Sequence, residues 1–172
     1  LFHIVTIFPL SWITLYTEQS VSEFLMVQVL GAGLAALAML ASGMIADRIG
    51  RRRTLGALAV AIAVFSGFAP TLLDGGTFGQ DTFILIGFIL LGLSYGQASG
   101  TVTSNFSAKY RYTGAALTAD VAWLVGAAFA PLVALGLSAH FGLGYVSVYL
   151  LSGAACTLTA LWVNSTLESR EG

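Results

Sequence analysis

The chain has 172 residues, of which 57% are hydrophobic and 9% are charged, and its formal net charge is −1. An ordinary soluble domain is about 25% charged, so this composition excludes a typical soluble fold and predicts a surface that largely faces lipid. The balanced charge gives no indication of nucleic-acid binding. The single cysteine, Cys156, excludes an internal disulfide, and no residue spacing is typical of a metal site or a catalytic triad. We therefore expect no cofactor and no enzymatic activity.

Apolar runs long enough to cross a bilayer follow one another along the chain. A membrane-crossing helix needs about 20 mostly apolar residues. Six runs fit this length approximately: residues 1–17, 22–46, 54–73, 82–106, 113–139 and 143–164. Leu1 is not Met and already lies inside the first run, so we expect the chain to be a piece of a longer protein. The pattern predicts an all-α, polytopic membrane protein in which residues 1–172 form one bundle of six transmembrane helices.

Basic residues occur on one side of this predicted bundle only. Four of the seven lie within six positions, between the second and third runs, and the others follow the fourth and sixth runs: Arg48, Arg51, Arg52, Arg53, Lys109, Arg111 and Arg170. The opposite connections carry Glu18, Glu23, Asp74 and Asp81. Cytoplasmic loops collect Lys and Arg, so the basic connections and both termini are expected in the cytoplasm. The membrane is expected to be a bacterial inner membrane.

Small residues recur at every fourth position of the fourth run, at Gly92, Gly96 and Gly100, followed by Ser104. They form one smooth helix face that lets a neighbouring backbone approach closely. Such a face is compatible with ordinary helix packing and with a sliding surface between moving bundles, and the sequence alone leaves both open.

The basic turn carries a specific motif, Gly-x-x-x-Asp-Arg-x-Gly-Arg-Arg, at Gly43, Asp47, Arg48, Gly50, Arg51 and Arg52. It resembles the signature loop of the major facilitator superfamily, whose members have twelve helices in two six-helix halves. The resemblance implies a cytoplasmic gate, in which these residues tie helix ends together when the cytoplasmic side is closed. Determination of topology and anchoring to lipid headgroups is an alternative role for the arginines.

Later segments resemble helices ten and eleven of the metabolite:proton symporter branch of that superfamily. These segments are Tyr95-Gly96-Gln97-Ala98, Arg111-Tyr112-Thr113-Gly114-Ala115 and Ala130-Pro131-Leu132. The resemblance implies that the chain is the carboxyl-terminal half, helices seven to twelve, and that its partner is an amino-terminal half or a second copy in a homodimer. It also implies symport of a small polar metabolite, an organic acid or a zwitterion, with protons by alternating access. The alternative is a non-transporting membrane scaffold that reuses the half-fold.

Asp120 is the acidic residue placed well inside a predicted span. An ionised carboxylate there costs a few kcal/mol unless it is paired or hydrated. Asp120 is therefore the candidate for proton coupling. A structural role, in which it caps a neighbouring helix or pairs with a loop arginine, is the alternative.

Aromatic and polar side chains in the first, fourth and fifth runs are candidates for a substrate cavity. By resemblance, helices seven and ten line this cavity, and the candidates are Trp12, Tyr16, Tyr95, Gln97, Thr101 and Trp123. Trp12 and Tyr16 share a helical stripe with Phe8, and His3 is expected at the cytoplasmic end of that run. Lipid contact or an aromatic belt at the interface is the alternative for Trp12 and Tyr16. No span contains an internal Lys or Arg, so the main positive partner of an anionic substrate is expected from the other half.

Overall fold

The computed structural model describes residues 1–16, 20–104, 106–126 and 129–171, and for residues 99–101, 104, 125–126 and 164–171 it describes only the backbone. The regular structure of these segments is entirely helical, which confirms the predicted all-α class. The helices are α1 (Phe2–Thr6), α2 (Phe8–Tyr16), α3 (Val21–Ile49), α4 (Arg51–Asp74), α5 (Gly76–Ser104), α6 (Arg111–Gly126), α7 (Ala130–Phe141) and α8 (Gly144–Glu171).

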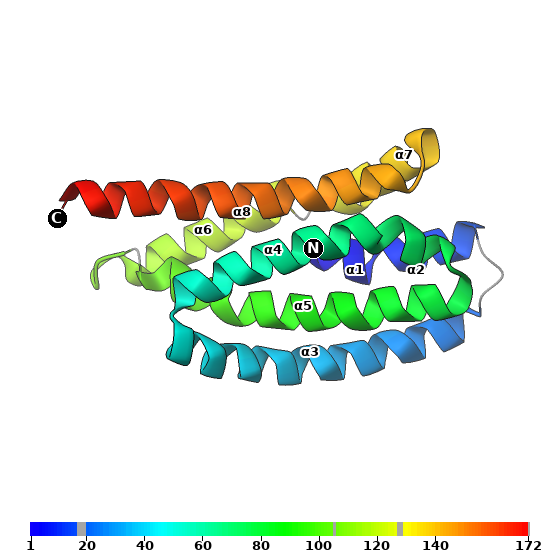
Figure 1. Cartoon of the computed structure of the whole chain (residues 1–172), viewed down its shortest axis with the longest axis horizontal. Coiled ribbons are helices and arrows are strands. Elements are labelled where there is room, and N and C mark those ends of the chain that lie inside the picture. The colour runs from blue at the N-terminus through cyan, green and yellow to red at the C-terminus, as the bar shows by residue number, and fades with distance from the viewer. Residues whose placement is uncertain (17–19, 105, 127–128, 172) are drawn as a thin grey trace.

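The long helices lie side by side along the longest axis of the molecule (Figure 1). Helix α5 packs against both α3 and α4, and α4 packs against α8. The short helices α1 and α2 contact α5, α7 and α3, and α6 lies against α5. The result is an elongated bundle in which α5 is the central helix.

Four helices are long and apolar enough to cross a membrane among the described residues. They are Val21–Ile49, Arg51–Asp74, Gly76–Ala98 and Gly144–Val163, and they match the second, third, fourth and sixth predicted spans. The first predicted span contains only the short apolar stretch Phe2–Tyr16. Among the described residues the structure therefore supports four membrane-crossing helices and does not confirm the predicted six.

The fifth predicted span, residues 113–139, is divided into two helices, α6 and α7. Pro131 occupies the first turn of α7, and Pro9 likewise follows the start of α2 by one residue. Proline has no backbone N–H and fits the first turn of a helix far better than its interior. The two prolines therefore favour helix starts at these positions. The fifth span over residues 113–139 stays a prediction.

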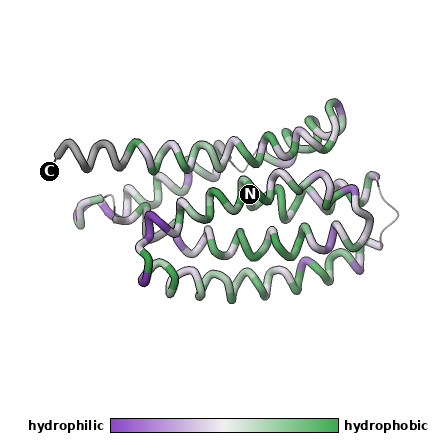
Figure 2. Tube along the Cα trace, in the orientation of Figure 1, coloured by the Kyte–Doolittle hydropathy of each residue, from purple (hydrophilic) through white to green (hydrophobic). Residues whose placement is uncertain are grey.

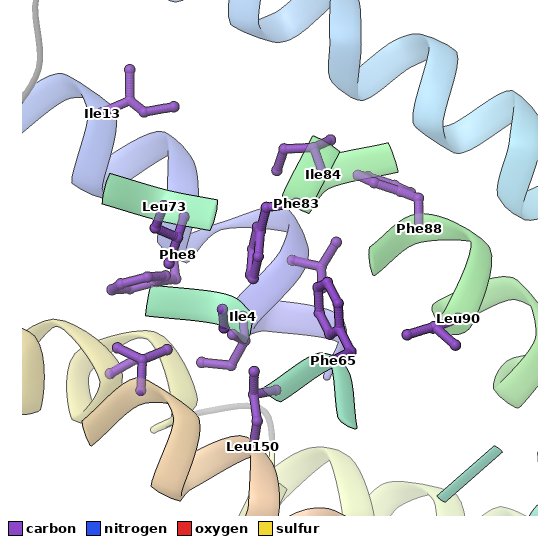
Figure 3. Close-up of a cluster of buried hydrophobic side chains, with 14 of the residues drawn as sticks. Ile4, Phe8, Ile13, Phe65, Leu73, Phe83, Ile84, Phe88, Leu90 and Leu150 are labelled. Atoms are coloured by element: carbon purple, nitrogen blue, oxygen red, sulfur yellow. The ribbon is translucent and has the colours of Figure 1, made fainter. Parts of the chain in front are cut away.

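A cluster of buried apolar side chains joins helices from both ends of the chain. Ile4 and Phe8 from α1 and α2 are fully buried, together with Leu73 of α4, Phe83 of α5 and Leu150 of α8 (Figure 3). The rings of Phe65 and Phe83 stack with centroids 5.0 Å apart. In a water-soluble protein, burying a large apolar side chain stabilises the fold by about 1.5–3 kcal/mol. Within lipid, the stabilisation comes mainly from close packing of the helices.

Helices α3 and α5 approach most closely at the small residues of α5. A Cβ atom added at Gly92 would lie 2.2 Å from the backbone oxygen of Ala35, and one at Gly96 would lie 2.9 Å from that of Met39. The predicted small-residue face is thus a tight helix interface at these two positions.

Hydrophilic residues gather at the turns, while the helices between them are mainly hydrophobic (Figure 2). The turn between α3 and α4 carries the arginines and passes through Gly50, whose φ of 89° is unfavourable for other residues. The opposite turn, between α4 and α5, passes through Gly76 with φ 67° and is flanked by Asp74 and Asp81. The molecule therefore has one basic end and one acidic end.

Candidate functional site

A groove of about 440 Å³ lies between α1, α5 and α6. Its α6 wall consists of Ala115, Thr118, Ala119, Ala122 and Trp123, which recur at the spacing of a single helix face. The α5 wall includes Tyr95, Ala98 and Thr103, and the α1 wall includes Phe2 and His3. We call this feature the α1–α5–α6 groove. Its lining is mainly apolar with a few polar groups, which is typical of small-molecule sites.

Three rings cluster at one wall of this groove. The centroid of Phe2 lies 5.0 Å from that of His3 and 5.5 Å from that of Trp123. The His3 and Trp123 centroids are 5.8 Å apart. Both ring nitrogens of His3 are buried, and neither has a hydrogen-bond partner among the described residues. A buried polar group without a partner is costly, so this imidazole is the unusual feature of the groove.

The chain starts about midway along the long axis of the bundle (Figure 1). The position of His3 at the cytoplasmic end of its span stays a prediction. Hydropathy identified the apolar run but not its depth. The signal that could have singled out His3 was a titratable residue inside an apolar run.

Tyr95 and Trp123 both line the groove, so two of the predicted cavity residues share one surface. Trp12 and Tyr16 stack on each other with centroids 4.2 Å apart, and Trp12 also stacks with Phe8 at 6.3 Å. Neither Trp12 nor Tyr16 lines the groove. The side chain of Thr101 lies outside the described residues.

Gln97 is 2% exposed and lies between α5 and α3 rather than in the groove. Its Nε2 donates to the carbonyl oxygen of Ser42 at 2.8 Å and to the Ser42 hydroxyl at 2.7 Å. This position joins two helices and does not support direct substrate contact, because the amide donor faces Ser42.

Asp120 is exposed on α6. It directly follows Ala119, which lines the groove, but does not itself belong to the lining. The structure therefore does not bring Asp120 together with Tyr95 and Trp123 in the groove.

The signature loop occupies the basic end of the bundle, where Asp47, Arg48 and Arg51 are exposed. Gly43 lies one helical turn earlier on α3, and Gly50 separates α3 from α4. Arg52 donates a hydrogen bond from a guanidinium nitrogen to the carbonyl oxygen of Leu161 on α8 at 2.8 Å. One arginine of the motif thus links the loop to a helix distant in sequence. No cluster of His, Cys, Asp and Glu suited to a metal ion occurs in the part of the chain that the structure describes.

Comparison with known proteins identifies relatives among bacterial transport proteins. The chain is 38% identical over 136 residues to a Haemophilus influenzae protein assigned to metabolite transport, a match that covers 78% of the chain and 30% of the relative. It is 33% identical over 170 residues to the Escherichia coli inner membrane metabolite transport protein YhjE, covering 94% of the chain and 38% of YhjE. No protein-family model matches the chain, and no solved structure matches it significantly.

A third relative is named for its substrate. The shikimate transporter of Escherichia coli is 30% identical over 169 residues, which cover 92% of the chain and 37% of that transporter. The chain thus spans between 30% and 38% of the length of these three relatives. The matches confirm the resemblance that the signature loop predicted: the chain is homologous to bacterial metabolite transport proteins.

Proposed function

We propose that the chain is the carboxyl-terminal half of a secondary transporter that moves a small polar metabolite across the bacterial inner membrane. The observation that carries this proposal is the α1–α5–α6 groove, found in a chain homologous to metabolite transport proteins. Its volume of about 440 Å³ is in the range of roughly 300–1,000 Å³ that small-molecule sites occupy. In transporters built from repeats, substrates bind near the bilayer midplane between the repeats.

The substrate class in this proposal is an organic acid or a zwitterion with an apolar body. Phe2, Tyr95 and Trp123 offer ring surfaces at the groove, and Thr103 and Thr118 add hydroxyl groups. The name of the shikimate transporter supports a ring-shaped carboxylate as the first compound to test. The other half of the protein supplies the remaining contacts in this proposal.

Alternating access and proton coupling complete the proposal. The hydrogen bond from Arg52 to the carbonyl oxygen of Leu161 on α8 supports a gate in which the signature loop ties neighbouring helices together at the basic end. Asp120, an exposed acid on α6, remains a candidate for proton coupling. The basic end is placed in the cytoplasm on the basis of its arginines.

The proposal is tested by a chimera in which this chain replaces the segment of the shikimate transporter that it matches. Cells that lack their own shikimate uptake receive the chimera, and labelled shikimate and a panel of organic acids and zwitterions are offered. Accumulation of at least one compound above the level of cells with an empty vector is expected. If the chimera inserts into the membrane but accumulates none of them, the chain acts as a non-transporting scaffold and the proposal is wrong.

A further inference from the structure

Asp120 is an exposed acidic residue on an otherwise apolar face of α6. Residues three and four positions apart lie together on a helix surface, so Asp120 shares this face with Ala116, Leu117 and Leu124. Leu117 is 63% exposed and Leu124 is 68% exposed. None of these four residues belongs to the lining of the groove. We call them the outer face of α6, and the helix leaves this face uncovered.

The position of Asp120 along α6 places it deep in a membrane. Helix α6 begins at Arg111, at the same end of the bundle as the basic turn between α3 and α4 (Figure 1). Asp120 follows nine positions later, which is about 13 Å along the axis at roughly 1.5 Å per residue. The hydrocarbon core of a bilayer is about 30 Å thick, so with Arg111 at the headgroups Asp120 lies within this core. An ionised carboxylate that faces lipid at such a depth is costly.

The chain offers Asp120 no basic partner at this depth. Asp120 makes no hydrogen bond or ion pair with any residue that the structure describes. Arg111 lies on the same helix but beyond the reach of its side chain. No Lys or Arg lies inside the apolar stretches of the sequence. A positive partner for Asp120 must therefore come from outside these 172 residues.

A second copy of the chain does not satisfy this requirement. Two copies related by a two-fold axis bring the same face of each together, which sets Asp120 near Asp120 of the other copy. Any other face of a second copy also lacks Lys and Arg inside its apolar stretches. A homodimer would therefore leave the carboxylate without a basic partner in the membrane.

The relatives of the chain are long enough to provide another cover. The matches extend over 30–38% of the length of these metabolite transport proteins. In transporters built from repeats, substrates bind between the repeats near the bilayer midplane. The α1–α5–α6 groove lies on one side of α6, and the outer face lies beside it on the same helix. A second half that closes over the groove would thus also approach the outer face.

We propose that the outer face of α6 docks against a membrane-spanning helix from the part of the transporter outside these 172 residues, and that this helix carries a lysine or arginine that pairs with Asp120. The basic group donates charge-assisted hydrogen bonds to the carboxylate, while Leu117 and Leu124 pack beside the pair and keep it from lipid. This inference rests on the proposed function, in which the chain is one half of a larger transporter, and it assigns Asp120 to the contact between the halves.

The test measures association of the 172-residue chain with single-span peptides in lipid vesicles. The probe is a leucine–alanine helix with one lysine at its centre, so that either orientation brings the lysine to a similar depth. The same peptide with glutamine at the centre is the matched control. Energy transfer to a dye on Thr77→Cys, an exposed position at the acidic end, reports binding in a Cys156→Ala background. The lysine peptide is expected to bind about tenfold or more tightly, and equal binding of both peptides or binding of neither would overturn the proposal.

Variants identify Asp120 as the group responsible. Asp120→Asn is expected to reduce binding of the lysine peptide to the level of the glutamine peptide, while Asp74→Asn, at an exposed acid of the opposite turn, is expected to keep the preference. Asp120→Lys is expected to reverse it, so that the host peptide with a central glutamate binds best. Circular dichroism checks that each variant is folded. A preference for lysine that survives in Asp120→Asn would contradict the pairing.

Crosslinking locates the docked helix. A single cysteine at Leu117 or Leu124 is expected to form a disulfide with a cysteine beside the peptide's lysine, whereas one at Ala122, on the groove side of α6, is not. Disulfides between two chains through Leu117→Cys, at the expense of the peptide, would show that a second copy covers this face and would overturn the proposal. Association that depends on Asp120 together with a chimera that fails to transport would contradict only the proposed function. A transporting chimera together with no preference for lysine would contradict only this inference.

Discussion

The side-chain amide of Gln97 on α5 donates hydrogen bonds to both the carbonyl oxygen and the hydroxyl of Ser42 on α3, at 2.8 and 2.7 Å. The Ser42 hydroxyl in turn donates to the carbonyl oxygen of Leu93 on α5 at 2.6 Å. These bonds cross the interface in both directions, close to where Gly96 brings the two backbones together. The pair fixes the register between α3 and the central helix of the bundle.

Replacing Gln97 with Leu is expected to destabilise the bundle by about 1 kcal/mol, because interhelical hydrogen bonds in membrane proteins contribute about that much. The measurement is unfolding in mixed micelles with increasing dodecyl sulfate, followed by circular dichroism. Thr159→Val is the control, since the Thr159 hydroxyl bonds only to Ala155 of its own helix. Equal stability of the two variants would show that the Gln97–Ser42 pair does not hold α3 and α5 together.

Gly92→Ala is expected to destabilise the chain by about 2 kcal/mol, within the range observed for overpacking. The added methyl group would meet the backbone of Ala35 at 2.2 Å, and backbone atoms cannot move aside as a side chain can. Gly33→Ala is the matched control, because a Cβ there meets nothing within 4 Å. The stability of Gly33→Ala is expected to equal that of the unmodified chain or to exceed it slightly, because alanine has a higher helix propensity than glycine. The same unfolding assay measures both, and a tolerated Gly92→Ala would contradict the close approach.

Arg52→Gln is expected to weaken the contact between the signature loop and α8, with a loss of about 1 kcal/mol in the same assay, because an exposed charged donor contributes modestly. Arg53→Gln removes the same charge from the neighbouring position, which is also exposed, and serves as the control for topology and lipid attraction. Disulfide crosslinking between cysteines placed on α4 and α8 reports the contact directly. If both variants behave alike, the arginines act only through their charge.

The orientation of the bundle is tested with single cysteines in a Cys156→Ala background. Arg53→Cys places a thiol at the basic end, and Thr77→Cys places one at the acidic end, both at exposed positions. In intact spheroplasts, a thiol reagent that cannot cross membranes is expected to label Thr77→Cys and not Arg53→Cys until the cells are opened. The reverse pattern would contradict the cytoplasmic position of the basic turn.

The sequence predicted much of the architecture because lipid imposes a simple rule on helix length and apolarity. Helices α3, α4, α5 and α8 follow from their apolar runs, and the turns follow from Gly50 and the charged residues. Residues 113–139 were predicted as one span, whereas α6 ends at Gly126 and Pro131 lies in the first turn of α7.

The site was less predictable than the fold. Polar residues at membrane depth have the same appearance in a sequence whether they join helices or contact a ligand. Gln97 and Tyr95 are two positions apart on α5, yet Gln97 faces Ser42 and Tyr95 faces the groove. Which face meets which neighbour depends on the packing of α3 and α6, and that is a tertiary property.

The central claim is transport by this chain as half of a metabolite carrier, and accumulation in proteoliposomes tests it most directly. The chimera with the shikimate transporter is reconstituted, an inward proton gradient is imposed, and labelled shikimate and the panel of organic acids and zwitterions are followed inside the vesicles. We expect at least one compound to accumulate above its external concentration and to leave when an uncoupler removes the gradient. Entry no faster than into protein-free vesicles, for every compound and with correctly inserted chimera, would contradict the account.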